Sequence, residues 1–161
     1  MDINLLSRAI AEVGECLRVE DNFLATAESC TGGLLASMLT DCPGSSEWYA
    51  GSIVAYGYDV KTKLLGVDKA VLEEHGAVSE PVVKAMAEGV LKTVGAQVSV
   101  AISGIAGPGG GTPEKPVGTV WMAWAWPGGV RAKRFDFTGS RSEIKGQSVM
   151  AAVNGLLSVV R

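Results

Sequence analysis

The sequence is poor in the residues that most often bind metal ions or form disulfide frameworks. It contains one histidine, His75, and three cysteines, Cys16, Cys30 and Cys42. The cysteines form an odd set, and neither they nor the histidine have the spacing of a zinc site. This pattern argues against a disulfide-stapled domain and a structural zinc. We therefore expect reduced thiols, no metal and no cofactor.

Long apolar runs and clusters of basic charge are also missing. No apolar stretch approaches the roughly 18 residues that span a bilayer, and the first residues, MDINLLSRAI, lack the features of a signal peptide. The net charge is −3, and Lys and Arg are scattered. Nucleic acid therefore has no basic surface to bind. We expect a soluble cytoplasmic protein with a small-molecule partner, and neither a membrane nor a nucleic-acid partner.

Apolar residues and glycine are plentiful instead. Hydrophobic residues make up 47% of the 161 positions and charged residues only 19%, which predicts one domain, residues 1–161, with a substantial core. Glycine occurs 21 times and is concentrated at residues 32–33, 104–111 and 128–129. Such glycines mark turns and close backbone approaches.

Hydrophobic periodicity divides the chain into alternating helices and strands. Apolar residues at helical spacing predict a helix over about residues 3–18 with Asp2 as N-cap, and another over SEPVVKAMAEGVLKTV capped by Ser79. Thr31 is the expected cap of a short helix, and a further helical segment begins near Asp59. The runs FLATA, YAGSIVAYG and QVSVAISGIAG read as strands.

The last third of the chain predicts a β-hairpin followed by a helix. VGTVWMAWAW and VRAKRFDF are strands joined by the turn PGG. The hairpin's tryptophans are expected to cover the core, with nucleotide stacking as the alternative. Ser140 and Glu143 have the spacing of a capping box that opens the last helix. Together these elements predict an α/β layered domain with a mixed sheet.

The stretch TAESCTGG, residues 26–33, carries the most reactive groups. Glu28, Ser29, Cys30 and Thr31 fall between a strand and a helix, where α/β folds place ligands and helix N–H groups attract anions. The alternative is that these hydroxyls only cap and turn the chain. A nucleophilic serine needs a base, and His75 is expected on the surface. A lysine serves if its pKa is lowered, and VAYGYDVKTKLLGV offers Lys61 and Lys63.

Five motifs, in order along nearly the whole chain, resemble the CinA carboxy-terminal domain family. They are ATAESCTGG, VAYGYDVKTKLLGV, HGAVSEPVV, SGIAGPGGGTPEKPVGTVW and FTGSR. The resemblance implies a single amidohydrolase domain with a three-layer α/β/α sandwich and a mixed, mostly parallel sheet. It also implies the conversion of nicotinamide mononucleotide to nicotinate mononucleotide and ammonia, a step of pyridine nucleotide recycling, without a metal.

The same resemblance assigns roles to individual residues. Ser29 would attack the carboxamide, Lys61 would remove the serine proton and Tyr56 would relay or orient it. Backbone N–H groups after Thr31 would hold the oxyanion, with Arg141 on the phosphate. Cys30 is expected to be a buried neighbour rather than the nucleophile. The predicted substrate-binding residues are Glu28, Cys30, Thr31, Gly32, Gly33, Ser103, Gly104, Gly107 and Arg141.

The chain departs from the family pattern at one place near the predicted base. Where active members commonly read Tyr-Ser-Asn, this sequence reads Tyr56, Gly57 and Tyr58. Two alternatives to an enzyme therefore stay open. One is a non-catalytic nucleotide-binding domain with Lys61 charged and facing solvent, and the other is an interaction module that builds an oligomer through its tryptophans. A homo-oligomer is expected in either case.

Overall fold

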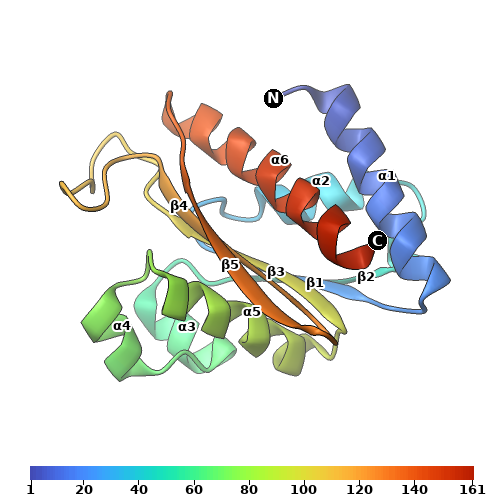
Figure 1. Ribbon diagram of the computed structural model, residues 1–161, viewed down its shortest axis with the longest axis horizontal. Coiled ribbons are helices and arrows are strands. Elements are labelled where there is room, and N and C mark those ends of the chain that lie inside the picture. The colour runs from blue at the N-terminus through green and yellow to red at the C-terminus, as the bar shows by residue number, and fades with distance from the viewer.

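The computed structural model describes residues 1–161 and consists of an open five-stranded sheet between two layers of helices (Figure 1). The strands lie in the order β2-β1-β3-β4-β5. They are β1 (Leu24–Glu28), β2 (Tyr49–Val54), β3 (Val98–Gly104), β4 (Thr119–Trp126) and β5 (Gly129–Asp136). The helices are α1 (Ile3–Val19), α2 (Leu34–Thr40), α3 (Tyr58–Leu65), α4 (Lys69–His75), α5 (Glu80–Val94) and α6 (Arg141–Val160), with a 3₁₀ turn, η1 (Ser45–Glu47).

The sheet is mixed. β1 is parallel to both β2 and β3, while β3 and β4, and β4 and β5, pair antiparallel. Four of the five strands therefore run in one direction, and β4 alone runs against them. The predicted mixed, mostly parallel sheet and the late antiparallel hairpin are both confirmed.

Helices cover both faces of the sheet. α1, α2 and α6 lie on one face, and α3, α4 and α5 on the other (Figure 1). Each layer has its own apolar cluster against the sheet: Leu6, Trp48 and Trp124 belong to the first, and Leu65 and Met86 to the second. The three-layer α/β/α sandwich is thus confirmed, and Trp124 packs in the core as predicted. None of the helices combines the length and the apolarity needed to cross a membrane.

Local capping sets most helix boundaries where the sequence predicts them. The Asp2 carboxylate accepts from the Leu5 N–H at 3.1 Å, and Ser140 heads a complete capping box. The segment expected to begin near Asp59 is two helices rather than one. Gly66, at φ 65°, ends α3 in the left-handed region, and Asp68 caps α4.

The topology creates a crevice at the carboxyl ends of the parallel strands. The chain leaves β1 through α2 on one face and returns from β2 through α3, α4 and α5 on the other. Connections that diverge in this way from neighbouring strands leave room for a ligand between them. The TAESCTGG stretch leaves β1 at this edge of the sheet.

Candidate active site

Ser29 is held rigidly at the carboxyl end of the central strand. It follows the last residue of β1, and its N–H donates to the Ile102 carbonyl of β3 at 2.9 Å. The carbonyl of the same peptide group, that of Glu28, accepts from the Ala55 N–H at 2.8 Å. The serine is therefore braced from both neighbouring strands, and its side chain keeps 7% of its surface exposed.

Lys61 reaches this serine from α3. Its Nζ donates to Ser29 Oγ at 3.0 Å, to the Ala55 carbonyl at 2.7 Å and to the Tyr56 carbonyl at 3.0 Å. The predicted proximity of Ser29 and Lys61 is present, whereas the other lysine of the motif, Lys63, is exposed. The non-catalytic alternative could leave this lysine facing solvent, whereas in the fold it is buried against Ser29.

The environment of Lys61 disfavours its charged form. The residue is 1% exposed, and no carboxylate forms an ion pair with it. Burial lowers the pKa of the amine from its usual 10.5 to about 8. A sizeable fraction of the lysine is then neutral near physiological pH, which is the form that can accept a proton.

Glu28 has a structural position rather than a substrate-facing one. Its carboxylate is fully buried and accepts from the N–H groups of Gly33, Leu35 and Ala36 at 3.0, 3.1 and 2.8 Å. These are the unpaired donors at the start of α2, so the carboxylate caps the helix from the strand before it. The Glu28 oxygens are held by these donors and do not line the cleft beside Cys30, so its predicted contact with substrate stays a prediction.

The prediction that Thr31 caps α2 is wrong. The N-cap is Gly33, at φ 96°, and Gly32 at φ 61° is left-handed as well. These two glycines move the helix start two residues along, and the Thr31 hydroxyl is buried without a hydrogen-bond partner. Glycine is required here because other residues rarely adopt this backbone conformation.

The turn also decides which N–H groups are free. Gly32 donates to the Ser29 carbonyl at 3.1 Å and Gly33 donates to Glu28, so neither is available to a ligand. The N–H groups of Cys30 and Thr31 donate no hydrogen bond within the protein. The backbone donors without a partner are thus the two that directly follow Ser29, and of these only Cys30 keeps exposed surface, 5% against 0% for Thr31.

Arg141 and Tyr56 meet at a cleft that Cys30, the neighbour of Ser29, also lines. Arg141, the first residue of α6, donates from Nη1 to the Gly107 carbonyl at 2.8 Å and from Nη2 to Tyr56 Oη at 3.3 Å. The Tyr56 side chain is 63% exposed, and its hydroxyl bonds neither Ser29 nor Lys61. A cleft of about 200 Å³ lies here, lined by Cys30, Tyr56, Gly104, Ile105, Ala106, Gly107, Gly109, Gly110 and Arg141.

The remaining predicted binding residues divide between the cleft and the core. Gly104 and Gly107 line the cleft, and Gly107 has no room for a side chain, because a Cβ there would lie 2.5 Å from Val117. Ser103 is buried in β3 and does not line it. Cys30 lines the cleft but is nearly buried, and burial raises the pKa of its thiol to about 11. Cys30 is therefore a neutral thiol at pH 7.

Sequence reasoning missed Lys145. It lies one helical turn after Arg141, is half-buried, and forms no ion pair or hydrogen bond. Its Nζ is 3.9 Å from the position that a Cβ on residue 32 would occupy. The sequence carried a signal, because residues 141 and 145 continue the α6 stripe that packs on the sheet further along, at Ser148, Val149, Ala152 and Leu156.

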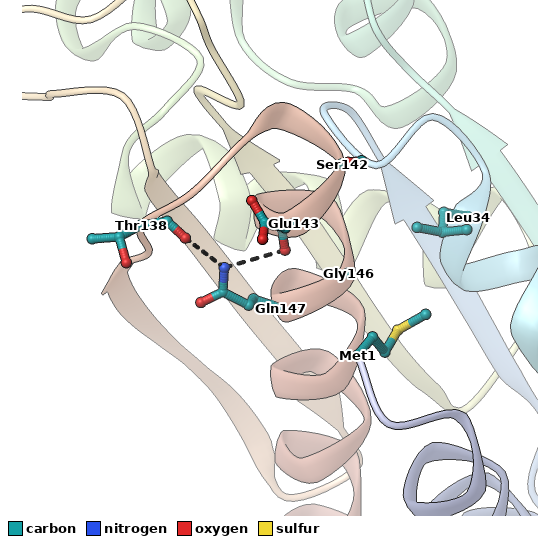
Figure 2. Close-up of a pocket in the computed structure, with 7 residues that line it drawn as sticks. All are labelled: Met1, Leu34, Thr138, Ser142, Glu143, Gly146 and Gln147. Atoms are coloured by element: carbon teal, nitrogen blue, oxygen red, sulfur yellow. Dashed lines mark hydrogen bonds between the residues drawn. The ribbon is translucent and has the colours of Figure 1, made fainter.

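The opposite side of the α6 start contains a second hollow of about 460 Å³ (Figure 2). The Gln147 amide there donates to the carbonyls of Thr138 and Glu143. The Glu143 carboxylate closes the capping box with Ser140, which lowers its pKa. The only charged side chain lining this hollow is thus an acid, and it lies near the amino terminus of Met1. It is lined by Met1, Leu34, Thr138, Ser142, Glu143, Gly146 and Gln147.

Comparison with known sequences identifies relatives over nearly the whole chain. Residues 7–160 match the profile of the CinA C-terminal domain. A CinA-like protein of Akkermansia muciniphila is 54% identical over 146 residues, and one of Gemmatimonas aurantiaca is 51% identical over 144. These alignments include 90% and 89% of this chain but only 35% and 33% of those proteins. The chain thus spans about a third of the length of these relatives.

Solved structures of similar length have the same fold. The competence/damage inducible protein of Agrobacterium tumefaciens superposes with a TM-score of 0.94 at 36% identity, over 97% of this chain and 96% of that one. A competence-damaged protein (CinA) superfamily protein of Escherichia coli gives 0.94 at 34% identity, over 99% and 92%. The α/β architecture is therefore shared with independently determined structures.

Proposed function

Because the chain belongs to the CinA C-terminal domain family, we propose that it is an amidohydrolase that converts nicotinamide mononucleotide and water to nicotinate mononucleotide and ammonia. The reaction would serve the recycling of pyridine nucleotides. The observation that carries the proposal is the 3.0 Å contact between the buried Lys61 amine and the Ser29 hydroxyl. A nucleophilic serine paired with a base of lowered pKa is the minimum that amide hydrolysis by covalent catalysis needs.

The carbonyls around Lys61 orient its lone pair. The charged amine has three N–H donors, which match its three acceptors: Ser29 Oγ and the carbonyls of Ala55 and Tyr56. A neutral amine keeps two donors, and these suffice for the two carbonyls. The lone pair then points at Ser29, whose O–H donates to it. Tyr56 therefore serves the base through its main chain rather than through a relay by its phenol.

Acyl transfer follows from this arrangement. Ser29 Oγ attacks the carboxamide carbon while its proton passes to Lys61, and the carbonyl oxygen becomes an oxyanion. The N–H group of Cys30, which has no partner within the protein and keeps some exposed surface, is the proposed donor for that charge, in place of the N–H groups expected after Thr31. The Lys61 ammonium then protonates the leaving nitrogen, and ammonia departs. Water, deprotonated by the same amine, hydrolyses the ester and restores Ser29.

Arg141 organises the cleft in this mechanism. Its guanidinium ties α6 to the glycine-rich loop at Gly107 and to Tyr56, so three segments distant in sequence meet at one side chain. Only some of its five N–H donors are used by these contacts. The family resemblance implies that the others bind the phosphate of the substrate, whereas the contacts within the protein support an organising role.

The proposal is tested by product analysis with purified protein. Nicotinamide mononucleotide should yield ammonia and nicotinate mononucleotide in equal amounts, and Ser29→Ala should yield neither. Lys92→Ala serves as the control, because Lys92 is an exposed residue in the last turn of α5. Wild-type protein that binds the mononucleotide but releases no ammonia would identify a nucleotide-binding domain instead.

A further inference from the structure

Two basic residues of α6, Arg141 and Lys145, lie on the face that packs against the sheet further along the helix. An α-helix turns about 100° per residue, so Arg141 and Lys145 share a face. That face continues into the buried residues Ser148, Ala152 and Leu156, which pack against the sheet. The core-facing stripe therefore becomes basic where it passes the carboxyl ends of the strands.

Lys145 is the cation of this pair without a partner. A lysine that loses part of its hydration gains from an acid or a carbonyl group nearby. Arg141 is matched by Gly107 and Tyr56, whereas no carboxylate lies within 4.0 Å of the Lys145 ammonium and no hydrogen bond engages it. A partner of negative charge supplied by a ligand would complete the arrangement.

The backbone facing Lys145 leaves space for such a ligand. Gly32 is exposed, and the only atom within 4 Å of its missing Cβ is Lys145 Nζ, at 3.9 Å. A side chain on residue 32 would enter the space in front of the ammonium. Residues four apart on a helix have Cβ atoms about 6 Å apart, so Arg141 and Lys145 can both reach one phosphate group.

We propose that Lys145 is the specificity residue that recognises the phosphate of the substrate, with Arg141 beside it mainly as the organiser of the cleft. This proposal rests on the proposed function for the identity of the rest of the ligand. It assigns the phosphate to the Gly32 side of α6 and not to the hollow of Figure 2, which Glu143 lines. The chemistry required of the ligand is a phosphate monoester attached to a carboxamide-bearing nucleoside.

The test compares nicotinamide mononucleotide with nicotinamide riboside, which lacks the phosphate. Lys145→Gln should raise KM for the mononucleotide by about 10- to 100-fold, the effect of one lost charge-assisted contact. It should leave kcat at saturation and all constants for the riboside nearly unchanged. Lys145→Arg should restore most of the mononucleotide affinity, and Lys92→Gln should behave as wild type. Equal losses on both substrates, or no loss on either, would overturn the proposal.

Binding separates this proposal from the proposed function. Calorimetry with nicotinate mononucleotide and nicotinate riboside needs no turnover. A weaker Kd for the mononucleotide alone in Lys145→Gln supports the phosphate role even if wild type releases no ammonia. Wild type that binds the mononucleotide no better than the riboside overturns it.

Discussion

The Nζ of Lys61 lies 3.0 Å from the Oγ of Ser29, although the two residues are 32 positions apart and belong to different layers of the fold. The contact joins the end of the central strand β1 to the helix α3 on one face of the sheet. Both side chains are buried, and no acid neutralises the amine. This pair is the basis of the first two predictions.

Ser29, and not its neighbour Cys30, should be the nucleophile. Ser29→Ala should abolish ammonia release while nicotinate mononucleotide still binds. Cys30→Ala should stay within about tenfold of the wild-type kcat, because a thiol whose pKa is about 11 is neutral at pH 7, and this one forms no hydrogen bond with Lys61. Steady-state kinetics of the two variants measure this. If Cys30→Ala were inactive and Ser29→Ala active, the nucleophile would be the thiol.

The rate should follow the deprotonation of Lys61. Burial lowers the pKa of this amine to about 8, so below pH 8 the amine is mostly protonated and cannot accept the serine proton. We expect kcat/KM to rise about tenfold per unit from pH 6 towards 8 and to level off above. The affinity for nicotinate mononucleotide, measured over the same range, controls for binding. A flat profile between pH 6 and 9 would contradict the role of the amine.

Glu28 should matter for stability and for the position of the serine. Glu28→Ala removes the acceptor of three N–H groups at the start of α2. Each buried donor left unpaired costs about 1–3 kcal/mol, and some will recover a water, so we expect about 3 kcal/mol less free energy of unfolding. Urea denaturation measures this, with the exposed Glu73→Ala as control. An unchanged midpoint would show that the buried carboxylate does not support α2.

Arg141→Lys should slow both substrates alike. A lysine retains the charge but cannot donate at once to Gly107 and Tyr56, as the guanidinium fork does. We expect kcat/KM for the mononucleotide and the riboside to fall by similar factors, about tenfold, the effect of losing one charge-assisted contact. This contrasts with Lys145→Gln, which should affect only the mononucleotide. A loss confined to the mononucleotide would assign phosphate recognition to Arg141 instead.

The fold followed from the sequence wherever the determining contacts are local. Asp2 and Ser140 accept from N–H groups three residues along the chain, so their caps are readable from spacing. The helical spacing of apolar residues likewise marked helices, and short apolar runs marked strands. The break between α3 and α4 was missed although Gly66 and Asp68 signal it, because the apolar pattern runs on through that segment.

The site was less predictable because its key contacts are distant or depend on the backbone. The family motif pointed to Ser29, to Lys61 and to the Tyr56 phenol as a relay, whereas the phenol is exposed and the main-chain carbonyl of Tyr56 accepts from Lys61. Two left-handed glycines displaced the helix start from Thr31 and gave Glu28 the role of a cap. The proximity of Lys145 to the turn after β1 could not be predicted from the sequence, because it depends on how the fold places α6.

Chemical rescue of Lys61 tests most directly the claim that its neutral amine activates Ser29. Lys61→Ala should lower kcat for nicotinamide mononucleotide by about 10²- to 10⁴-fold, the usual contribution of a general base. Added methylamine should restore part of the rate in proportion to the concentration of its uncharged form, and should have no effect on Ser29→Ala. Lys61→Ala that retains wild-type turnover, or that still shows the rise in rate towards pH 8, would contradict the account.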